Sequence, residues 1–541
     1  MKKRYLSLAL AGILAFGSLL AGCGGFEDSK KENSGSTTSA SEKVLRVAIQ
    51  EDLPTFDPAK IEDNQSSFVG ELTYSTLYKT GKDGKPVAEV AEKYDVNEDG
   101  TVYTFTLKDT KWSNGDTVLA SDYKYAWLRA IDPKTASTQS ERFFPIKNAE
   151  KFYRGEAKAE DVGLKVVDDK TLEVTLESSD SLFVDKICYP TFAPLNEKAI
   201  TNNEEWLKDP TKAIFNGPFK LNVMNLGSKL ELVKNDTYFN KDKVKLDKID
   251  VQIIKDQNSV YELFNSGQID ILGSPTQSIP ADKIEEAKTK EEYQQYPYML
   301  IQWAKFNVED KLLQNVHLRR ALSYAVDRGS IIKGILKDNG QVAVMGFNPD
   351  KAGKADYWKD HDVEAAKKEL DIAIKELGLN GPEDIKLEYR FNTNEDTQKI
   401  IQVIQETWKK DLGINVELKN EEWKVYLNSI ATGNYQIGRL GWIADVADVS
   451  DFLNMYQKKD GGNNQTNWYN EEFDKLIEQA KSETDQTKRM ELLDKAEAIM
   501  VDEMPVMPLY TSKNSFLVSK KVKNFNCNLL GRVNFAELDI E

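Results

Sequence analysis

The stretch Tyr435-Gln-Ile-Gly-Arg-Leu-Gly-Trp-Ile-Ala-Asp-Val-Ala-Asp448 joins an apolar run to two fixed charges. The apolar residues Ile437, Leu440, Trp442 and Ile443 predict a buried strand. Arg439 lies inside this run, and Asp445 follows its end. Charges at the end of a buried strand are costly unless each has a partner. The stretch therefore predicts either an internal ion pair or a charged ligand.

Two interpretations of these charges are open on the residues alone. In the first, Arg439 and Asp445 form a salt bridge with each other in a domain core. In the second, they line a pocket for a zwitterion, where Asp445 meets an ammonium group and Arg439 meets a carboxylate. Gly438 and Gly441 would leave room there for another backbone to approach the strand closely.

The motif Gly441-Trp-Ile-Ala-Asp445, with Arg439 two residues before it, resembles the ligand-holding strand of a known family. This family is the OppA-type oligopeptide-binding lipoproteins of bacterial ABC importers, within family 5 of the extracellular solute-binding proteins. The likeness keeps a consistent order over residues 45–540. Its further motifs are Trp112-Ser-Asn-Gly-Asp116, Asn216-Gly-Pro-Phe-Lys-Leu221, Leu318-Arg-Arg-Ala-Leu-Ser-Tyr-Ala-Val-Asp-Arg328 and Asn463-Asn464.

The resemblance implies an α/β, class II, periplasmic-binding-protein-like fold. Two α/β lobes would be joined by a hinge, and a small α+β domain would be added to the first lobe. The expected boundaries are 44–78, 183–298 and 508–541 for the first lobe, 79–182 for the extra domain and 299–507 for the second lobe. The candidates for the crossovers between lobes are Pro297–Phe306 and the region of Pro505 and Pro508.

The resemblance also implies roles for the charged residues and for two strands. In the family, the Asp of the motif pairs with the peptide α-amino group, and the Arg can meet the carboxylate of short peptides. Main-chain pairing with strands would satisfy the peptide backbone without regard to its side chains. The implied ligand-binding residues are Asp445, Arg439, Trp442, Trp303, Gln302 and Leu300, together with Gly441 and Ile443 through their backbones. For Trp303 and Trp442, the alternative is an ordinary aromatic core.

One position departs from the family pattern. Some members carry a second basic residue upstream of the Arg, near the position that Ile430 fills here. The resemblance therefore does not imply where a longer peptide places its carboxylate. Related ligands within the superfamily, namely dipeptides, signalling peptides, a metal chelate or haem, are the alternatives to oligopeptides. The motif Gly-Trp-Ile-Ala-Asp favours oligopeptides among them.

Charge and composition exclude several other functions. The 541 residues include 88 acidic and 72 basic ones, and the net charge is −16. A surface this acidic argues against nucleic acid and against peripheral binding to anionic lipid. His317 and His361 lie apart, and no Cys-x-x-Cys, Walker or Gly-x-Ser-x-Gly motif occurs. We therefore expect no metal or other cofactor, and no enzyme; a hydrolase acting through Asp445 and Asp448 lacks a nucleophile or water-activating partner.

The N-terminus is typical of an exported lipoprotein. Lys2-Lys-Arg4 precedes the apolar run Leu6–Leu20, which is short for a membrane span and predicts a signal peptide over residues 1–22. Leu20-Ala-Gly-Cys23 resembles the bacterial lipobox, in which the Cys is lipidated; the alternative is an incidental Cys. Residues 23–43 are then expected to comprise the lipidated Cys23 and, from residue 24 on, a flexible tether of small polar residues. The chain is expected to be a monomer on the outer face of a membrane of Gram-positive type, delivering oligopeptides to ABC permease subunits.

Periodicity predicts several local elements. Alternating apolar residues indicate strands at 44–49 and 102–107 and a hairpin over 166–176. Helical spacing indicates helices over 68–78, 362–377 and 396–412, and Gly378 would end the second of these. The repeated order of helix, glycine and strand is typical of α/β layers. Cys188 and Cys527 are expected to be buried free thiols, and one disulfide between them is the alternative.

Overall fold

The computed structural model describes residues 42–541, except 62, 202–205, 207–208, 344–356 and 458–463. Residues 42–541 form one compact unit. In the part that the structure describes, strands build two four-stranded sheets, one seven-stranded sheet and two short pairs. The seven-stranded sheet contains the strand that leads to Asp445, and helices pack on both of its faces.

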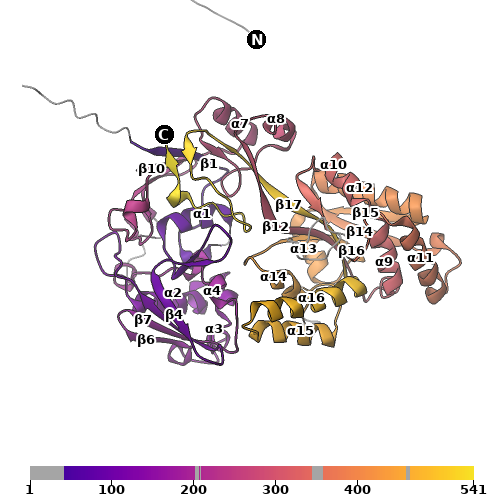
Figure 1. Ribbon diagram of the computed structural model, residues 1–541, viewed down its shortest axis with the longest axis horizontal. Helices are drawn as coiled ribbons and strands as arrows, with labels where there is room; N and C mark the ends of the chain where they lie inside the picture. Colours follow the sequence, from indigo (N-terminus) through magenta and orange to yellow (C-terminus); the bar gives the residue numbers. More distant parts are fainter. Residues whose placement is uncertain (1–41, 62, 202–205, 207–208, 344–356, 458–463) are drawn as a thin grey trace, which may run out of the picture. The chain divides into compact units, whose positions relative to one another are not determined.

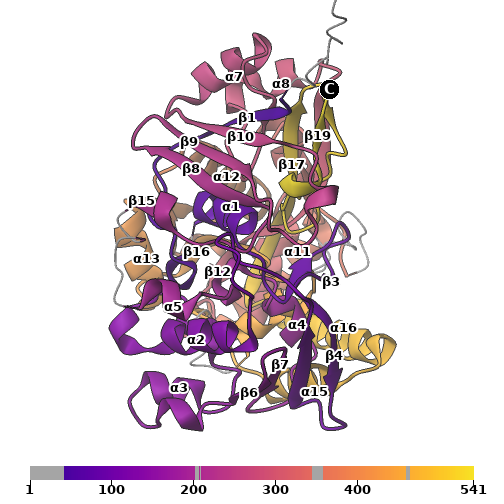
Figure 2. The ribbon, with the colours of Figure 1, turned by 90° about the vertical axis from the view of Figure 1, so that its left-hand side faces the viewer.

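The first sheet has the strand order β1-β10-β9-β8. Its strands are β1 (Val44–Ile49), β10 (Lys248–Ile253), β9 (Lys229–Lys234) and β8 (Phe219–Asn225). The chain enters through β1, which is parallel to β10, and the other neighbours are antiparallel. Figure 2 shows this sheet above α1 (Asn64–Thr73). The strand predicted at 44–49 is confirmed.

The helix predicted over 68–78 is wrong in its bounds. Helix α1 begins after Asp63, which caps it, and ends at Thr73. The next residues leave the helix because Asn216 bonds both main-chain groups of Ser75, accepting from its N–H and donating to its carbonyl at 2.9 Å each. The partner lies 141 residues away in the chain. The apolar spacing of 68–78 therefore continues past the true end of the helix.

The second sheet is a small antiparallel one with the order β4-β5-β7-β6. Its strands are β4 (Ala91–Val96), β5 (Val102–Leu107), β7 (Thr171–Thr175) and β6 (Leu164–Asp168). The strand at 102–107 and the hairpin near 166–176 are confirmed. Helices α2 (Ala120–Ile131) and α3 (Ala149–Tyr153) lie beside this sheet in Figure 2. Short elements nearby are β2 (Tyr78–Thr80), β3 (Pro86–Ala88), α4 (Phe183–Lys186) and α5 (Glu197–Ile200).

The third sheet has the order β11-β17-β12-β16-β14-β15, with β13 also on β17. Its strands are β11 (Ile271–Leu272), β17 (Val506–Val518), β12 (Tyr293–Phe306), β16 (Ile437–Ile443), β14 (Leu387–Asn392), β15 (Val416–Glu421) and β13 (Gly340–Val342). The long strands β12 and β17 pair antiparallel. Figure 1 shows them side by side, running from the part that carries β1 and β10 toward the part that carries α9 and α11.

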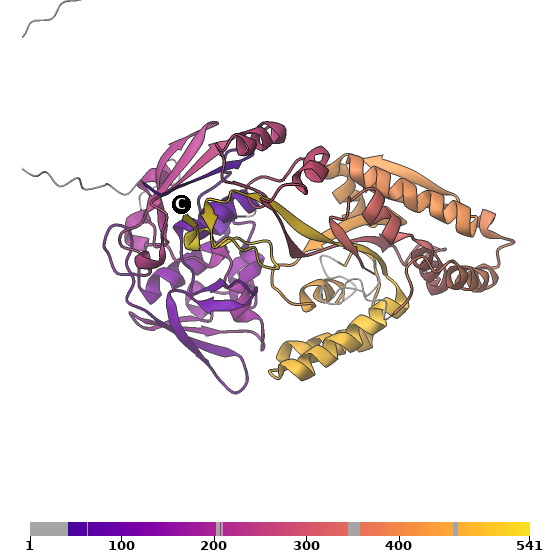
Figure 3. The ribbon, with the colours of Figure 1, turned by 45° about the horizontal axis from the view of Figure 1, so that its top comes forward.

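Helices cover the third sheet on both faces. One apolar cluster contains residues of α9 (Val316–Ala325), α10 (Arg328–Gly334), α11 (Val363–Leu377) and α12 (Glu395–Thr407). Another contains residues of α14 (Ser450–Leu453), α15 (Glu471–Ser482) and α16 (Gln486–Glu503). Further helices and strands among the described residues are α13 (Trp423–Ala431), α7 (Gln257–Asn265), α8 (Ile284–Ala287), β18 (Val522–Lys523) and β19 (Asp539–Ile540). By its colour in Figure 3, the yellow C-terminal segment returns among the indigo and magenta elements of the N-terminal part.

The sequence predicted the helix at 362–377 correctly. Asp362 caps its first turn, and Gly378 ends it with a φ of 66°. The helix predicted at 396–412 is regular only to Thr407, and a π-helical turn, Trp408–Leu412, follows. Trp408 Nε1 donates to the carbonyl of Leu322 at 2.7 Å, which ties that turn to α9.

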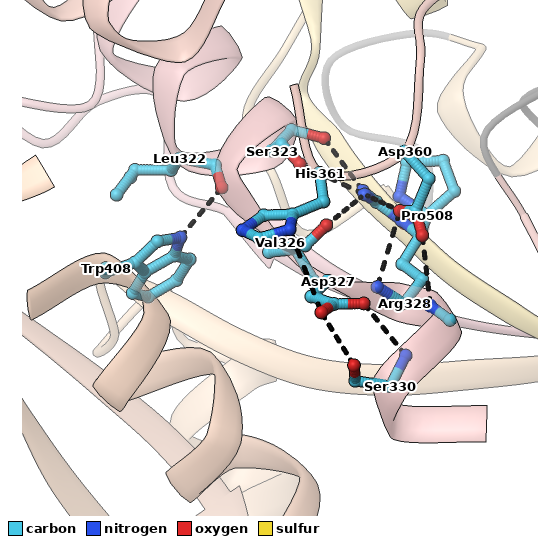
Figure 4. Close-up of polar contacts among 11 residues, drawn as sticks. Leu322, Ser323, Val326, Asp327, Arg328, Ser330, Asp360, His361, Trp408 and Pro508 are labelled. Atoms are coloured by element: carbon cyan, nitrogen blue, oxygen red, sulfur yellow. Dashed lines mark hydrogen bonds and ion pairs between the residues drawn. The ribbon is translucent and has the colours of Figure 1, made fainter. Parts of the chain in front are cut away.

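The motif that ends at Arg328 has a structural role. The side chain of Arg328 is fully buried, and its Nε donates to the carbonyl of Pro508 at 2.7 Å, as Figure 4 shows. The same guanidinium bonds Ser323 and forms an ion pair with Asp360 at 3.3 Å. Burying a charge requires such partners. Arg328 therefore fastens the helices α9 and α10 to β17.

Cys188 and Cys527 are both buried and free, as expected. Over the described residues, every helix is too short or too polar to cross a membrane. The predicted signal peptide and the predicted lipidation site, Cys23, lie outside those residues.

Candidate functional site

Among the described residues, no strand pairs with Gly441–Ile443 on the edge of β16 that faces away from β12, and this edge is called open below. Neighbouring strand β14 pairs with β16 only at Ile437 and Gly438. On the other side, Ala444 N–H donates to the Met299 carbonyl at 2.9 Å, and the register pairs Gln302 with Gly441. Because antiparallel pairs alternate between bonded and non-bonded, the main-chain groups of Gly441 and Ile443 point away from β12. They can therefore bond an added extended chain.

The side chains of β12 and β16 divide between the two faces of the sheet, because successive residues of a strand alternate. Trp442 and Leu440 share a face with Trp303 and pack on the cluster that contains α14 to α16. Leu300, Gln302, Arg439 and Ile443 share the opposite face. Trp303 is fully buried, which matches the alternative of a core aromatic. It packs edge-on against Phe452 and Tyr456, with centroids 6.4 and 6.3 Å away.

The expectation that β16 is a buried strand is only partly correct. Ile437 is fully buried, but Leu440 and Trp442 are half-buried and Ile443 is 42% exposed. The exposure begins where β14 stops pairing. The two glycines also differ from expectation, because side chains fill the room that they leave. A Cβ at Gly438 would lie 2.4 Å from Ile430 Cδ1, and one at Gly441 would lie 2.4 Å from Gln302 Nε2.

Arg439 lies in a setting of aromatic side chains. Its Nη1 donates weakly to Asn392 Oδ1 at 3.4 Å, and its carbonyl accepts a hydrogen bond from the Tyr426 hydroxyl. Burial raises the pKa of Tyr510, and the positive charge of Arg439 opposes that rise. Trp423, 45% exposed, stacks on Tyr426 with centroids 6.0 Å apart. Helix α13 therefore adds an exposed aromatic side chain next to Tyr426, which itself bonds the main chain of Arg439. The sequence alone did not indicate this residue.

Asp445 pairs with Arg142 and, over the described residues, not with Arg439. Its Oδ1 accepts a hydrogen bond from Arg142 Nη2 at 3.2 Å, and its side chain remains 41% exposed. Among the residues that the structure describes, Arg439 and Asp445 do not form an ion pair with each other. Arg439 lies within β16, and Asp445 follows two residues after its end. A ligand with an ammonium group can therefore still reach Asp445.

Asp451 lies behind Asp445. One oxygen of Asp451 accepts from Trp442 Nε1 at 2.8 Å and from the Asp445 N–H at 3.1 Å. Burial, and secondly the negative charge of Asp445, raise the pKa of Asp451 to about 6. Asp451 thus fixes both Trp442 and the main chain at Asp445.

The raised pKa gives a stability prediction for Asp451→Asn. An unfolded Asp titrates near pH 4, so the folded protein holds the proton of Asp451 more tightly than the unfolded chain does. The contribution of Asp451 to the free energy of unfolding therefore falls as pH rises from about 4 to about 7. The variant cannot ionise there and keeps an acceptor oxygen. We expect the free energy of unfolding of the variant to exceed that of the wild type by about 2 kcal/mol at pH 8. At pH 4 the two should be equal. Denaturant titrations at the two pH values measure this, with exposed Asp99→Asn as the control. An equal effect at both pH values would show that ionisation of Asp451 is not the cause.

The donor set of the site suits an organic ligand. Over the described part of the chain, no group of three or more His, Cys, Asp or Glu side chains is placed to hold a metal ion. What the site offers is an open strand edge, a carboxylate after the strand and a guanidinium within it.

Comparisons with known proteins place the chain in a family. The model for the bacterial extracellular solute-binding proteins, family 5 (middle part), matches residues 85–464. The oligopeptide-binding protein OppA of Bacillus subtilis is 38% identical over 542 residues, and the dipeptide-binding protein DppE of the same organism is 33% identical over 550; 99% of each chain is covered. The unliganded open form of the periplasmic murein tripeptide-binding protein MppA has a TM-score of 0.81 at 27% identity and covers 93% of this chain and 98% of its own.

The chain belongs to family 5 of the bacterial extracellular solute-binding proteins. This confirms the family indicated by the motif around Trp442 and Asp445, the class II fold with its extra domain, and the expectation of a binding protein without enzymatic activity.

Proposed function

We propose that the protein binds oligopeptides as the extracellular binding component of an ABC importer. The observation that carries this proposal is the open edge of β16, with Asp445 just beyond its end. An extended peptide can pair with the main chain of Gly441 and Ile443, as in β-augmentation. The names of the relatives support a peptide as the ligand.

In this proposal the two charges hold the ends of the ligand. Asp445 binds the α-ammonium, and Arg439 binds the carboxylate of short peptides. Gln302, Leu300 and Ile443 border the bound chain from one face of the sheet, and the half-buried Trp442 borders it from the other face. Trp303 acts indirectly, by supporting the sheet from its buried face. Strands β12 and β17 are the crossovers about which the two proposed lobes, 299–507 and the remaining folded chain, close on the ligand.

Mass spectrometry of the protein purified under mild conditions tests the ligand class. We expect a heterogeneous set of peptides with free amino termini to be released on denaturation. Asp445→Ala, purified in parallel, should carry far less peptide. A single metal chelate or haem in the wild-type protein would contradict the proposal.

We propose that a lipid on Cys23, which lies outside the described residues, anchors the protein to the membrane. Cys23→Ala removes the side chain that would carry the lipid. We expect this variant to leave the membrane fraction, because stable attachment requires two acyl chains or an equivalent second signal. Cell fractionation measures the distribution, and peptide titration of the released protein should give wild-type affinity. Cys188→Ala is the control, since Cys188 is buried within the fold. If Cys23→Ala stays membrane-bound, the anchor lies elsewhere.

A further inference from the structure

The Arg142 side chain is held in place by contacts with Gln139 and Tyr189. Its Nε donates to Gln139 Oε1 at 2.6 Å, and its guanidinium lies 4.2 Å from the centroid of the Tyr189 ring. The Tyr189 hydroxyl is 3.3 Å from Ser67 Oγ. These contacts do not involve Asp445. Arg142 therefore does not need Asp445 to keep its position.

The contact between Arg142 and Asp445 is a single bond. Only Nη2 reaches Asp445, at 3.2 Å from Oδ1, and the two side chains are 28% and 41% exposed. An ion pair of this kind is weak, because water screens it and one hydrogen bond holds it. Asp445 itself is fixed through its main chain by Asp451. A ligand cation can therefore replace Arg142 without moving Asp445.

We propose that Arg142 takes the place of the ligand's ammonium at Asp445 in the empty protein and determines specificity as an internal competitor. This rests on the proposed function, in which Asp445 binds the peptide α-ammonium. Two cations around one carboxylate repel each other. The incoming ammonium therefore breaks the contact between Arg142 and Asp445, while the contacts of Arg142 with Gln139 and Tyr189 remain. Ligands with an amino-terminal cation overcome this competition, whereas ligands without one leave the pair intact.

The test compares Arg142→Gln with the wild-type protein by calorimetric titration of tetra-alanine and of N-acetyl-tetra-alanine. Without its competitor, Asp445 should bind tetra-alanine about two- to tenfold more tightly. Affinity for the acetylated peptide should change less than twofold. The matched control is Arg154→Gln, which removes the same charge from an exposed residue that pairs with Glu150. It should leave both affinities unchanged.

A double-mutant cycle with Asp445→Asn separates the two proposals. The gain from Arg142→Gln should vanish in the Asp445→Asn background. If Arg142→Gln leaves the affinity for tetra-alanine unchanged or weakens it, the competitor role is overturned while the peptide-binding function stands. If the wild type binds neither peptide, or if Asp445→Asn binds tetra-alanine as tightly as wild type, the anchor role of Asp445 fails and this inference fails with it.

Discussion

Asp445→Ala is expected to weaken the binding of peptides with a free amino terminus by roughly 30- to 5,000-fold. The variant leaves the ligand's ammonium without its carboxylate when the peptide is enclosed, and losing one partner of such a pair costs about 2–5 kcal/mol. At about 1.4 kcal/mol per tenfold change, this cost gives the stated range. Calorimetric titration of one peptide and its N-acetylated twin measures it.

The acetylated twin supplies the control for this prediction. On the wild-type protein it should bind more weakly by a comparable factor, since it lacks the cation. On Asp445→Ala the two peptides should bind with similar affinity. Thermal unfolding without ligand should change little, because Asp445 is 41% exposed and its ion pair with Arg142 has one hydrogen bond. Equal affinities of the two peptides for wild type would exclude the anchor role.

Trp303→Ala is expected to lower the free energy of unfolding by about 3–5 kcal/mol, the usual cost of removing a large buried aromatic side chain. Trp303 is fully buried between β12 and the helices that follow β16. The matched variant is Trp423→Ala, which removes the same side chain from a 45% exposed position. It should change stability by no more than about 0.5 kcal/mol. Denaturant unfolding of both variants measures the difference.

The same pair of variants distinguishes core from ligand contact. If Trp303 lay beside the peptide, as the family resemblance implies, Trp303→Ala would lose affinity while keeping its stability. The burial of Trp303 favours the reverse outcome. A stable Trp303→Ala protein with weakened peptide binding would restore the implied role.

The elements that could be predicted from the sequence are those whose ends are set locally. The helix 363–377 has its cap, Asp362, and its terminating Gly378 within its own stretch. Strand 102–107 alternates between two environments, and the register of its neighbours does not change that pattern. The end of α1 could not be predicted, because Asn216, far along the chain, captures Ser75.

The candidate site follows the same rule. Asp445 and Arg439 stand out within one short stretch, since a charge beside an apolar run needs a partner. Arg142 does not stand out, because it meets Asp445 from 303 residues away. The exposure of Ile443 also depends on where β14 stops pairing, which no periodicity of β16 records. Trp423 could have been noticed as an aromatic residue at the start of α13, a helix rich in apolar residues.

The pairing of β12 with β17 has a consequence for the order in which the protein can be assembled. Tyr293 of β12 pairs with Leu517, and Lys305 pairs with Val506, so each contact joins residues about two hundred positions apart. Contacts of such long range form slowly, because loop closure must precede them. Until β17 is synthesised, one edge of β12 stays unpaired, and an open edge invites pairing with other chains. The strand that completes the frame of the binding site is thus among the last to arrive, and the emerging chain needs protection from association at β12 until then.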